Sequence, residues 1–399
     1  MPDLLTITDQ EVDRFRRETP GAGKVLHFNN AGAGLMPRRV LDAVKAHLDL
    51  EAETGGYEAA ATARPKLERA YSAIAGYLNC DPSEVAVMEN ATAAWNQAFF
   101  AVLGTMKAGE TILTAEAEYA SNYLSYLMAR ERYGIEIEVV PSDGDGELDL
   151  DALERLIDGS VRLIAVTHIP TNGGLVNPAE EIGRIARRHG IAYLLDACQS
   201  AGQRELDVRK IGCDFLSATG RKYLRGPRGT GFLYAGKAAA ERFPPPVIDL
   251  HAARWDGRDH YNWAEGAARY ENWENYEAGK IGLGVAVDLV LEIGAARIEK
   301  RVEALAGSLR ERLEAEAGVA VHDIGRTRSG ICTFTHPRLD ATAVKTALGG
   351  QGINVSTSTV YSTRIDMEKR GLPDLVRASV HYYNTENEVD RFVEAVARL

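Results

Sequence analysis

Residues 191–231 read IAYLLDACQSAGQRELDVRKIGCDFLSATGRKYLRGPRGTG. They contain two short runs of mostly apolar residues, 191–197 and 214–219, and polar residues follow each run. Apolar runs of this length are typical of strands that are buried on both faces of a parallel sheet. We therefore predict two strands of an α/β sheet, with Asp196 and Lys222 near their carboxyl ends, where the binding sites of such sheets gather.

The same alternation extends toward the N-terminus. Strand-like runs are separated by amphipathic stretches such as 178–190, in which apolar residues recur at helical spacing and Gly190 occupies the expected C-cap. Strands that alternate with helices indicate a mostly parallel sheet covered by helices on both faces. The predicted strands on this side are 84–88, 111–115, 135–141 and 161–169.

The pattern changes after about residue 280. A long helical region, 281–318, is followed by strand candidates at 329–336 and 375–382 and by a closing helix at 386–399. A chain of 399 residues is also too long for one ordinary core. We predict a large domain, 25–280, and a smaller α+β domain built from both chain ends, 1–24 plus 281–399.

Composition excludes several classes of function. The net charge of −11 and the lack of a basic stripe argue against binding to nucleic acid or anionic membranes. The sequence has neither a membrane-length apolar run nor a signal-peptide pattern at its start. The cysteines form no CxxC and no cluster with histidines, so we expect a cytoplasmic protein without disulfides or a metal site. They are Cys80, Cys198, Cys213 and Cys332.

Asp196 and Lys222 suggest a particular chemistry. A lysine at such a site can form a Schiff base with a carbonyl cofactor. Pyridoxal phosphate needs a lysine for its aldehyde, a carboxylate for its pyridinium nitrogen and donors for its phosphate. The two residues suit the first two roles, although an isolated aspartate at a strand end is more often an N-cap.

Five ordered motifs over residues 25–395 carry a family resemblance. The chain resembles the fold-type I, class V pyridoxal-phosphate enzymes, which include cysteine desulfurases, selenocysteine lyases, kynureninases and isopenicillin epimerases. The resemblance implies that Lys222 forms the Schiff base, Asp196 pairs with the ring nitrogen and Gln199 contacts the ring hydroxyl. It also implies that Arg377 binds the substrate carboxylate and that Asn30 lies at the substrate entrance. The motifs are 29–32 (NNAG), 196–199 (DACQ), 219–222 (TGRK), 226–231 (GPRGTG), and 377–379 (RAS) with 383–385 (YNT).

The resemblance also implies a phosphate site at 89–94, ENATAA, before a helix. A helix N-terminus offers backbone N–H groups and a positive dipole end to a dianion. Thr92 supplies one hydroxyl, but Ala93 replaces the second threonine of the family. Thr219 stands in for the family's serine. We interpret Arg221, which replaces its histidine, as compensation for the missing hydroxyl.

The resemblance places two further positions near the cofactor ring. Tyr119 falls where relatives stack an aromatic ring on the cofactor, although a core tyrosine at a helix start fits the pattern equally well. Thr171 falls where relatives carry an asparagine near the ring oxygen, and the neighbouring Asn172 is an alternative. We interpret His168 as a structural histidine.

The expected reaction begins with an external aldimine, from which Lys222 removes the α-proton. Desulfurases need a cysteine shortly before the RAS motif, and residues 354–375 contain none. The stretch 51–57, EAETGGY, resembles hercynylcysteine sulfoxide lyases, which implies a substrate-binding role for Tyr57. We therefore favour a lyase that cleaves a Cβ–S bond of a cysteine-type amino acid through a carbanion. The alternatives are an aminotransferase or epimerase of a small amino acid, and desulfurase activity is less favoured.

Six aromatic residues lie between positions 254 and 276. They indicate packing at a homodimer interface, the rim of an active site that grips an aromatic substrate, or both. A ligand-sensing regulator is a third class, but no DNA-binding segment precedes Leu26. A dinucleotide-binding dehydrogenase is excluded because no GxGxxG opens a helix after an early strand. The six are Trp255, Tyr261, Trp263, Tyr270, Trp273 and Tyr276.

Overall fold

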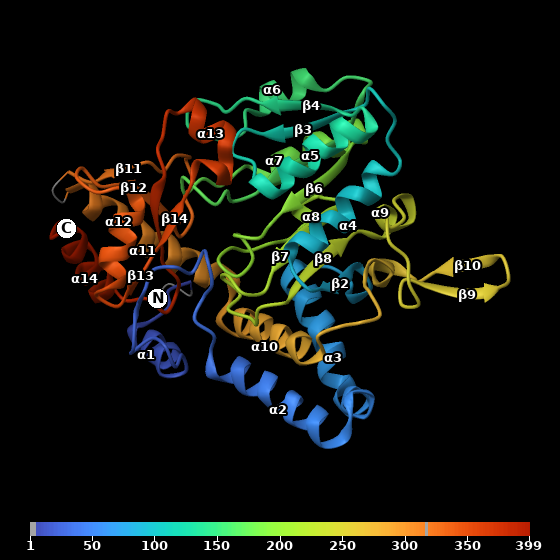
Figure 1. Ribbon diagram of the computed structural model, residues 1–399, viewed down its shortest axis with the longest axis horizontal. Helices are drawn as coiled ribbons and strands as arrows, with labels where there is room; N and C mark the ends of the chain where they lie inside the picture. The colour runs from blue at the N-terminus through green and yellow to red at the C-terminus, as the bar shows by residue number, and fades with distance from the viewer. Residues whose placement is uncertain (1–4, 316–317) are drawn as a thin grey trace.

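A seven-stranded sheet forms the centre of the protein in a computed structural model that describes residues 5–315 and 318–399 (Figure 1). Its strand order is β2-β8-β7-β6-β5-β3-β4. The strand β8 runs in the opposite direction to the other six strands of this sheet. The mostly parallel α/β sheet expected from the sequence is confirmed. Its strands are β2 (Val85–Met88), β3 (Thr111–Ala115), β4 (Glu136–Val140), β5 (Val161–Thr167), β6 (Ala192–Asp196), β7 (Phe215–Thr219) and β8 (Gly231–Ala235).

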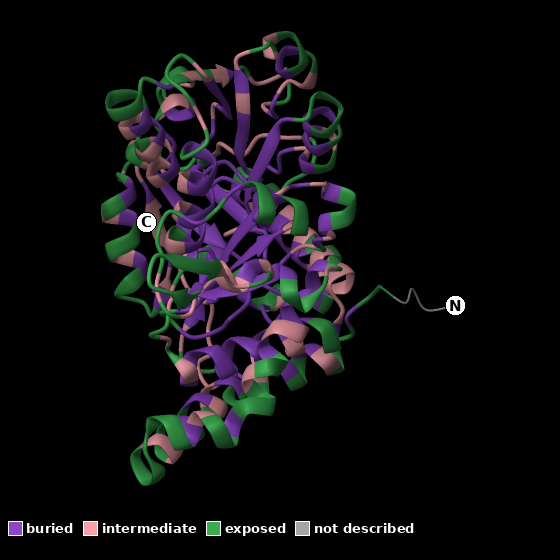
Figure 2. Ribbon diagram, turned by 90° about the vertical axis from the view of Figure 1, so that its right-hand side faces the viewer, coloured by how far each residue is buried: buried purple, intermediate pink, exposed green. Residues whose placement is uncertain are grey.

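Both faces of this sheet are covered. In β5, Leu163 and Ala165 belong to one hydrophobic cluster, whereas Ile164 and Val166 belong to another. Successive side chains of a strand point to opposite faces, so apolar residues at every position require cover on both sides. Figure 2 shows the buried strands between outer helices whose exposed sides face solvent.

The helices follow the predicted order with one break. The helical region expected at 281–318 is divided by Gly294, whose φ of 95° is incompatible with a continuous right-handed helix. The helices are α1 (Asp9–Arg17), α2 (Arg38–Thr54), α3 (Gly56–Leu78), α4 (Ala91–Leu103), α5 (Ala120–Tyr133), α6 (Leu150–Leu156), α7 (Ala179–His189), α8 (Val208–Ile211), α9 (Lys237–Arg242), α10 (Glu277–Ile293), α11 (Ala295–Ala315), α12 (Ala341–Gly349), α13 (Arg364–Lys369) and α14 (Glu386–Ala397), with 3₁₀ turns η1 (Pro82–Glu84), η2 (Gly266–Tyr270) and η3 (Val360–Thr363).

The C-terminal part has its own sheet and core. Four antiparallel strands lie in the order β11-β12-β15-β14, and β1 pairs in parallel with β13. Phe28, which follows β1, stacks on Phe392 of α14 at 4.4 Å. The N-terminal segment therefore completes this second core, while the proposed boundaries at residues 25 and 280 stay a prediction. The strands are β1 (Leu26–His27), β11 (Ala320–Val321), β12 (Ile331–Thr335), β13 (Ile353–Asn354), β14 (Ser356–Ser358) and β15 (Leu375–Ser379).

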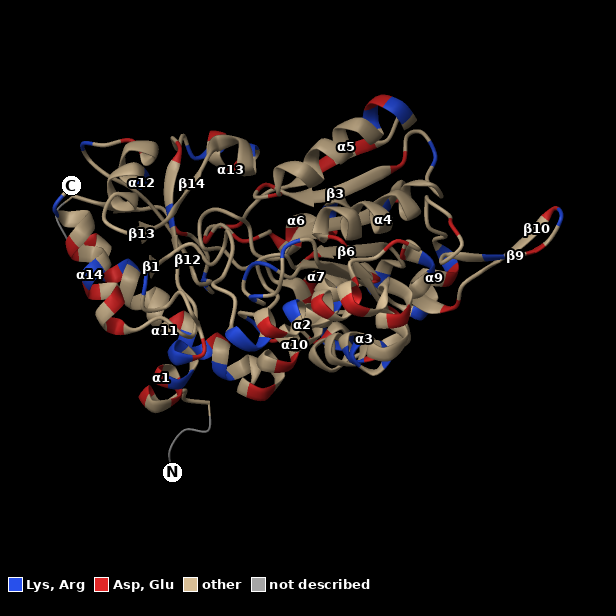
Figure 3. Cartoon of the chain, turned by 60° about the horizontal axis from the view of Figure 1, so that its bottom comes forward, with Lys and Arg blue, Asp and Glu red and all other residues tan. Residues whose placement is uncertain are grey.

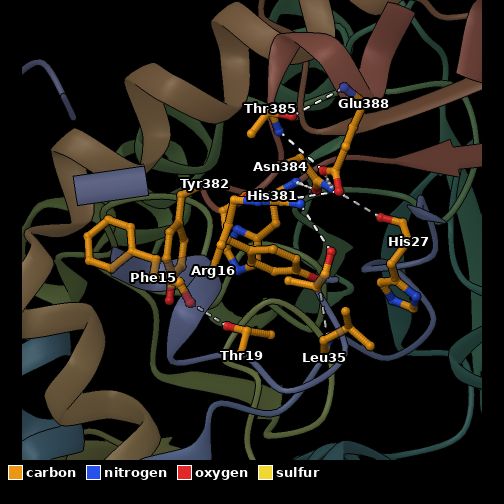
Figure 4. Close-up of polar contacts among 12 residues, drawn as sticks. Phe15, Arg16, Thr19, His27, Leu35, His381, Tyr382, Asn384, Thr385 and Glu388 are labelled. Carbon is orange, nitrogen blue, oxygen red and sulfur yellow. Dashed lines mark hydrogen bonds and ion pairs between the residues drawn. The ribbon is translucent and has the colours of Figure 1, made fainter. Parts of the chain in front are cut away.

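Polar contacts join the two ends of the chain (Figure 4). Arg16 of α1 forms an ion pair of 2.9 Å with Glu388 of α14. Asn384 donates hydrogen bonds to the same carboxylate, at 2.9 Å, and to the carbonyl oxygen of His27, at 3.3 Å. Because these groups are largely buried, the contacts fix the position of the N-terminal segment against the C-terminal core.

The loop after Lys222 is held by both ends of the chain. Arg225 has a left-handed backbone conformation, with φ of 62°, which is uncommon for a residue other than glycine. Its guanidinium donates hydrogen bonds to the carbonyl oxygen of Leu35 at 2.7 Å and to the hydroxyls of Thr19 and Tyr382 at 2.5 Å. The loop that carries Lys222 is thereby anchored to the N- and C-terminal segments at once.

A β-hairpin, β9 (Ala253–Gly257) and β10 (His260–Trp263), projects from the body (Figures 1 and 3). Trp255 and Tyr261 are 72% and 49% exposed on it. Tyr270, by contrast, is fully buried in the core of the main sheet, so the prediction of an interface or rim role for all six aromatics is wrong at this position. None of the helices within residues 5–315 and 318–399 is both long and apolar enough to span a bilayer.

Candidate active site

A cavity of about 410 Å³ opens at the carboxyl ends of β5, β6 and β7, beside the N-termini of α4 and α5. Pockets of this size and position are typical of small-molecule and cofactor sites in α/β proteins. The structure brings eight of the predicted site residues to its wall. They are Thr92, Tyr119, Thr171, Asp196, Gln199, Thr219, Arg221 and Lys222.

Asp196 is the last residue of β6 and is only 4% exposed. One carboxylate oxygen accepts the backbone N–H of Cys198 at 2.9 Å, and the other accepts the side-chain amide of Asn122 at 3.0 Å. The first contact caps the following turn, so the capping role considered in the sequence analysis is present. The residue still lines the cavity, where it offers a fixed negative charge to a cationic ligand.

Lys222 follows β7 and lies across the cavity wall from this carboxylate. Burial lowers the pKa of its amine; the charges of Cys198 and Asp196 oppose this change, and those of Arg221 and Arg377 add to it. A lowered pKa increases the fraction of neutral amine, which is the form that attacks carbonyl carbons and accepts protons.

The N-terminus of α4 forms another part of the wall. Asn90 is its N-cap, and its side-chain oxygen accepts the N–H of Ala93 at 2.9 Å. Asn90 and Thr92 line the cavity, but Ala93 is not among the lining residues. Ala93 was predicted to bind the cofactor, and this role stays a prediction, although its N–H already has a partner in Asn90. Asn90 was overlooked, although an asparagine before a helical run is a recognisable N-cap signal.

Arg221 and Thr219 lie near this helix end. Both residues line the cavity, and the Arg221 guanidinium donates a hydrogen bond to the carbonyl oxygen of Gly32. The remaining donors of a guanidinium suit a phosphate oxygen. Its role in replacing the missing threonine hydroxyl stays a prediction.

Tyr119 is the N-cap residue of α5 and is 37% exposed at the cavity. It is therefore not a core tyrosine, and its ring is available to stack on a planar ligand. His168 is buried and hydrogen-bonded to the Ser200 hydroxyl at 2.8 Å, which fits the structural role expected for it. Asn172 is also buried and donates to the Thr363 hydroxyl, whereas Thr171 lines the cavity.

Arg377 of β15 lies directly behind Thr171, to which its guanidinium donates hydrogen bonds. The side chain is buried, its Nε has no hydrogen-bond partner, and no carboxylate pairs with it among residues 5–315 and 318–399. Burial lowers the pKa of Arg377 to about 10, so the group is still charged at neutral pH. An unpaired buried cation is costly, which is the arrangement expected of a group that awaits an anionic ligand.

None of the three predicted substrate residues lines the cavity: Arg377 lies behind Thr171, and Asn30 and Tyr57 lie elsewhere. Asn30 is fully buried, and its side chain donates to the carbonyl oxygen of Ser379 at 2.8 Å and accepts from the Tyr383 hydroxyl at 2.6 Å. Protein groups thus occupy its amide, and its substrate role stays a prediction. Tyr57 is 79% exposed near the start of α3, so its substrate role stays a prediction.

Sequence reasoning overlooked residues both in the wall of the cavity and behind it. Thr167 and Cys198 line the cavity, while Glu118 and Asn122 lie behind its wall. A possible signal was the spacing of Glu118 and Asn122, which are four residues apart around a helix start and therefore share one face. Among residues 5–315 and 318–399, no three His, Cys, Asp or Glu side chains are grouped so as to hold a metal ion.

The cavity fits pyridoxal phosphate by the chemistry of its donors. It contains an amine of lowered pKa, a buried carboxylate and a helix N-terminus. The Oε1 atom of Gln199 is buried without a hydrogen-bond partner, so a hydroxyl at this wall would supply the missing donor. Lys222 would hold the aldehyde, Asp196 the ring nitrogen and the end of α4 the phosphate.

Comparison with known proteins agrees with this geometry. Residues 26–392 match the family model described as aminotransferase class-V. A probable cysteine desulfurase of Methanothermobacter thermautotrophicus is 31% identical over 392 residues, which cover 96% of this chain and 97% of the relative. This relative thus bears the name of desulfurase activity, which the lack of a cysteine in residues 354–375 made less favoured than C–S lyase activity.

Solved structures extend the comparison. The apo structure of cysteine desulfurase from Thermococcus onnurineus has a TM-score of 0.90 at 28% identity and covers 97% of both chains. The cystine C–S lyase C-DES, solved with its reaction product cysteine persulfide, has a TM-score of 0.84 at 25% identity and covers 95% of this chain and 99% of that one. With the fold, the cavity and the family match in agreement, the chain belongs to the class V aminotransferase family.

Proposed function

We propose that this chain is a pyridoxal-phosphate-dependent C–S lyase that releases a sulfur leaving group from Cβ of a cysteine-type amino acid. The observation that carries the proposal is one cavity that contains the Lys222 amine and the Asp196 carboxylate. Arg377, a buried and unpaired guanidinium, lies behind Thr171 in its wall. Family membership supports the cofactor, and the C–S lyase among the structural neighbours supports the reaction.

Pyridoxal phosphate, when bound, supplies an aldehyde that links to amines and a ring that withdraws electrons from the α-carbon. Asp196 would stabilise the protonated ring nitrogen by its charge. Arg377 would bind the α-carboxylate of the substrate and so orient the bond to be broken. Tyr119 would offer its ring for stacking on the cofactor ring.

Lys222 performs the proton transfer. Its neutral amine takes the proton from Cα, and the electron pair left there forms the Cα–Cβ double bond. The Cβ–S bond breaks, and sulfur leaves with its electron pair and takes up a proton. Water then hydrolyses the unsaturated amino acid to pyruvate and ammonia. The elimination itself needs no second nucleophile from the protein.

The positions of the cysteines favour elimination over desulfurase chemistry, in which a protein thiolate attacks the substrate sulfur. Residues 354–377 contain no cysteine. Cys332 is fully buried on β12, opposite Ala378. Cys198 lines the cavity, but burial raises the pKa of its thiol to about 12, so the nucleophilic thiolate is scarce at neutral pH. Desulfurase activity remains the second candidate because the curated relatives carry that name.

Product analysis separates the candidates. The cofactor-loaded enzyme is incubated with cystine, S-substituted cysteines or their sulfoxides. Elimination yields pyruvate and ammonia in equal amounts without an added keto acid, and Lys222→Ala abolishes both. Alanine together with sulfur bound to the protein would establish a desulfurase instead. Strict dependence on an amino acceptor would establish an aminotransferase, and racemised substrate an epimerase.

We also propose that the enzyme is a homodimer, with the β9–β10 hairpin and the preceding segment in the interface. Leu250 and Trp255 are 73% and 72% exposed there, and Val247 and Ile248 lie close by in sequence. Exposed apolar patches of this kind mark association sites. Sedimentation of the wild type and of Trp255→Glu tests this: a monomeric wild type would refute the proposal, and a variant shifted toward monomer would support it.

The expectation of a cytoplasmic location rests on the chemistry of the thiols. All four cysteines are free, and two of them are buried. Free thiols persist in a reducing compartment, where disulfides are rare. Fractionation of cells that produce the protein tests this expectation, and recovery in the membrane or secreted fraction would contradict it.

A further inference from the structure

A second carboxylate lies behind Asp196. Glu118 follows β3, precedes α5 and is only 3% exposed. It accepts the backbone N–H of Tyr119 at 2.8 Å, and it accepts both the backbone N–H, at 3.2 Å, and the hydroxyl of Thr167. The hydroxyl of Thr114 adds a further donor at 3.0 Å. Two of these neighbours, Tyr119 and Thr167, line the cavity, so Glu118 organises part of its wall.

Asn122 joins the two carboxylates. Its amide nitrogen lies 2.9 Å from Oε1 of Glu118 and 3.0 Å from Oδ2 of Asp196. An amide nitrogen carries two protons, so it can donate one to each oxygen. The bridge fixes the orientation of the carboxylate at the end of β6 relative to the start of α5.

The charge of Glu118 depends on its neighbours. Burial, together with the charge of Asp196, raises the pKa of Glu118 to about 7, although its many donors oppose the change. In the described part of the chain, the titratable groups that face it are Asp196 from β6 and Tyr126 from α5. A cation next to Asp196 would shift the balance toward the charged form.

We propose that Glu118 is a positioning residue of the cofactor site. Through Asn122 it orients Asp196, and its negative charge adds to that of Asp196 in keeping the ring nitrogen of the bound cofactor protonated. This inference rests on the proposed function, because it concerns the residues that would hold pyridoxal phosphate. It assigns a role to a buried acid that touches neither the substrate nor the reacting atoms.

The test compares two variants with a matched control. Asn122→Leu removes only the bridge and leaves the direct contacts of Glu118 in place. Glu118→Gln removes the charge at nearly constant volume. Glu271→Gln is the control: Glu271 is also buried and accepts from the Tyr71 hydroxyl at 2.9 Å and the Val87 N–H at 2.6 Å, away from the cavity. Thermal unfolding of each cofactor-free protein reports whether the fold is retained.

Two measurements are made with pyridoxal phosphate as the probe. Titration of the cofactor-free proteins gives its dissociation constant. NMR of cofactor labelled at the ring nitrogen shows whether that nitrogen is protonated at each pH. Both variants are expected to bind the cofactor about tenfold or more weakly, the effect of one charge-assisted hydrogen bond. They should also lose the ring proton at lower pH than the wild type and the Glu271→Gln control.

The outcomes are distinguishable. Wild-type affinity and a wild-type ring-nitrogen signal in Asn122→Leu and Glu118→Gln would overturn the inference while leaving the proposed function intact. Weaker cofactor binding with an unchanged titration of the ring nitrogen would mean that Glu118 has a structural role alone, and this result would also overturn the inference. A wild-type protein that does not bind the cofactor at all would refute the proposed function itself.

Discussion

Replacement of Arg377 by methionine should stabilise the protein while impairing catalysis. Burial lowers the pKa of Arg377 from the usual range of arginine to about 10, which corresponds to a cost of roughly 3 kcal/mol for the charged form. The variant loses the hydrogen bonds to Thr171, which contribute about 1–2 kcal/mol. Methionine fills a similar volume, so the free energy of unfolding of the cofactor-free protein should rise by about 1 kcal/mol.

The catalytic effect has the opposite sign. Truncation of a buried group that pairs with a charge costs about 2–5 kcal/mol, so kcat/KM for the amino-acid substrate should fall roughly thirtyfold to several thousandfold. Urea unfolding and steady-state kinetics measure the two effects. Arg310→Met is the matched control: Arg310 is equally buried but pairs with Asp323 at 2.6 Å, so its loss should destabilise the fold. Clear destabilisation of Arg377→Met with retained kcat/KM would refute the reasoning.

Three further predictions concern stability and cofactor binding. Burial lowers the pKa of His168 to about 3, so the native state takes up its proton only far below pH 6.5. The contribution of the neutral ring to stability is therefore complete above pH 6.5 and declines by roughly 1.4 kcal/mol per pH unit below it. Between pH 6.5 and 5, the free energy of unfolding of His168→Gln should fall by about 2 kcal/mol less than that of the wild type, as measured by urea titrations. An equal fall in both proteins would contradict this. Gly183→Ala would place its Cβ 1.8 Å from the carbonyl oxygen of Ile211, so the free energy of unfolding should fall by about 1–3 kcal/mol or more. Gly307→Ala is the control: its Cβ would have open space around it, so this variant should be neutral or slightly stabilised. Similar melting temperatures of the two variants would disprove the clash. Arg221→Ala should weaken cofactor affinity about tenfold if Arg221 replaces the missing hydroxyl, and unchanged affinity would rule that role out.

Much of the fold follows from local pattern. The strand that ends at Asp196 was predictable because residues 191–195 are apolar at every position, which is typical of burial on both faces of a sheet. The break at Gly294 was missed because one glycine inside a strong helical pattern is compatible with a continuous helix. The burial of Tyr270 was missed because composition groups it with exposed aromatic neighbours, whereas the fold turns its ring into the main core.

The candidate site was also predictable only in part. Asp196 and Lys222 were predictable because they lie at or just after the ends of strands that are evident in the sequence, whereas Gln199 was predicted from the family resemblance alone. Glu118 was not, since a lone glutamate before a helix is ordinarily a capping residue, and only the fold brings it to Asn122 and Asp196. The contacts of Asn30 were not predictable for the converse reason: its place in a motif says nothing about which protein groups bind its amide.

Reduction of the cofactor-loaded protein with borohydride tests the central claim most directly. The wild-type protein should turn yellow with pyridoxal phosphate, and peptide mapping after reduction should find the cofactor fixed on Lys222 alone. Lys222→Ala, equally folded by its melting temperature, should retain no reduced cofactor. A colourless wild-type protein, or cofactor fixed with equal yield in Lys222→Ala, would contradict the assignment of this cavity as a pyridoxal-phosphate site.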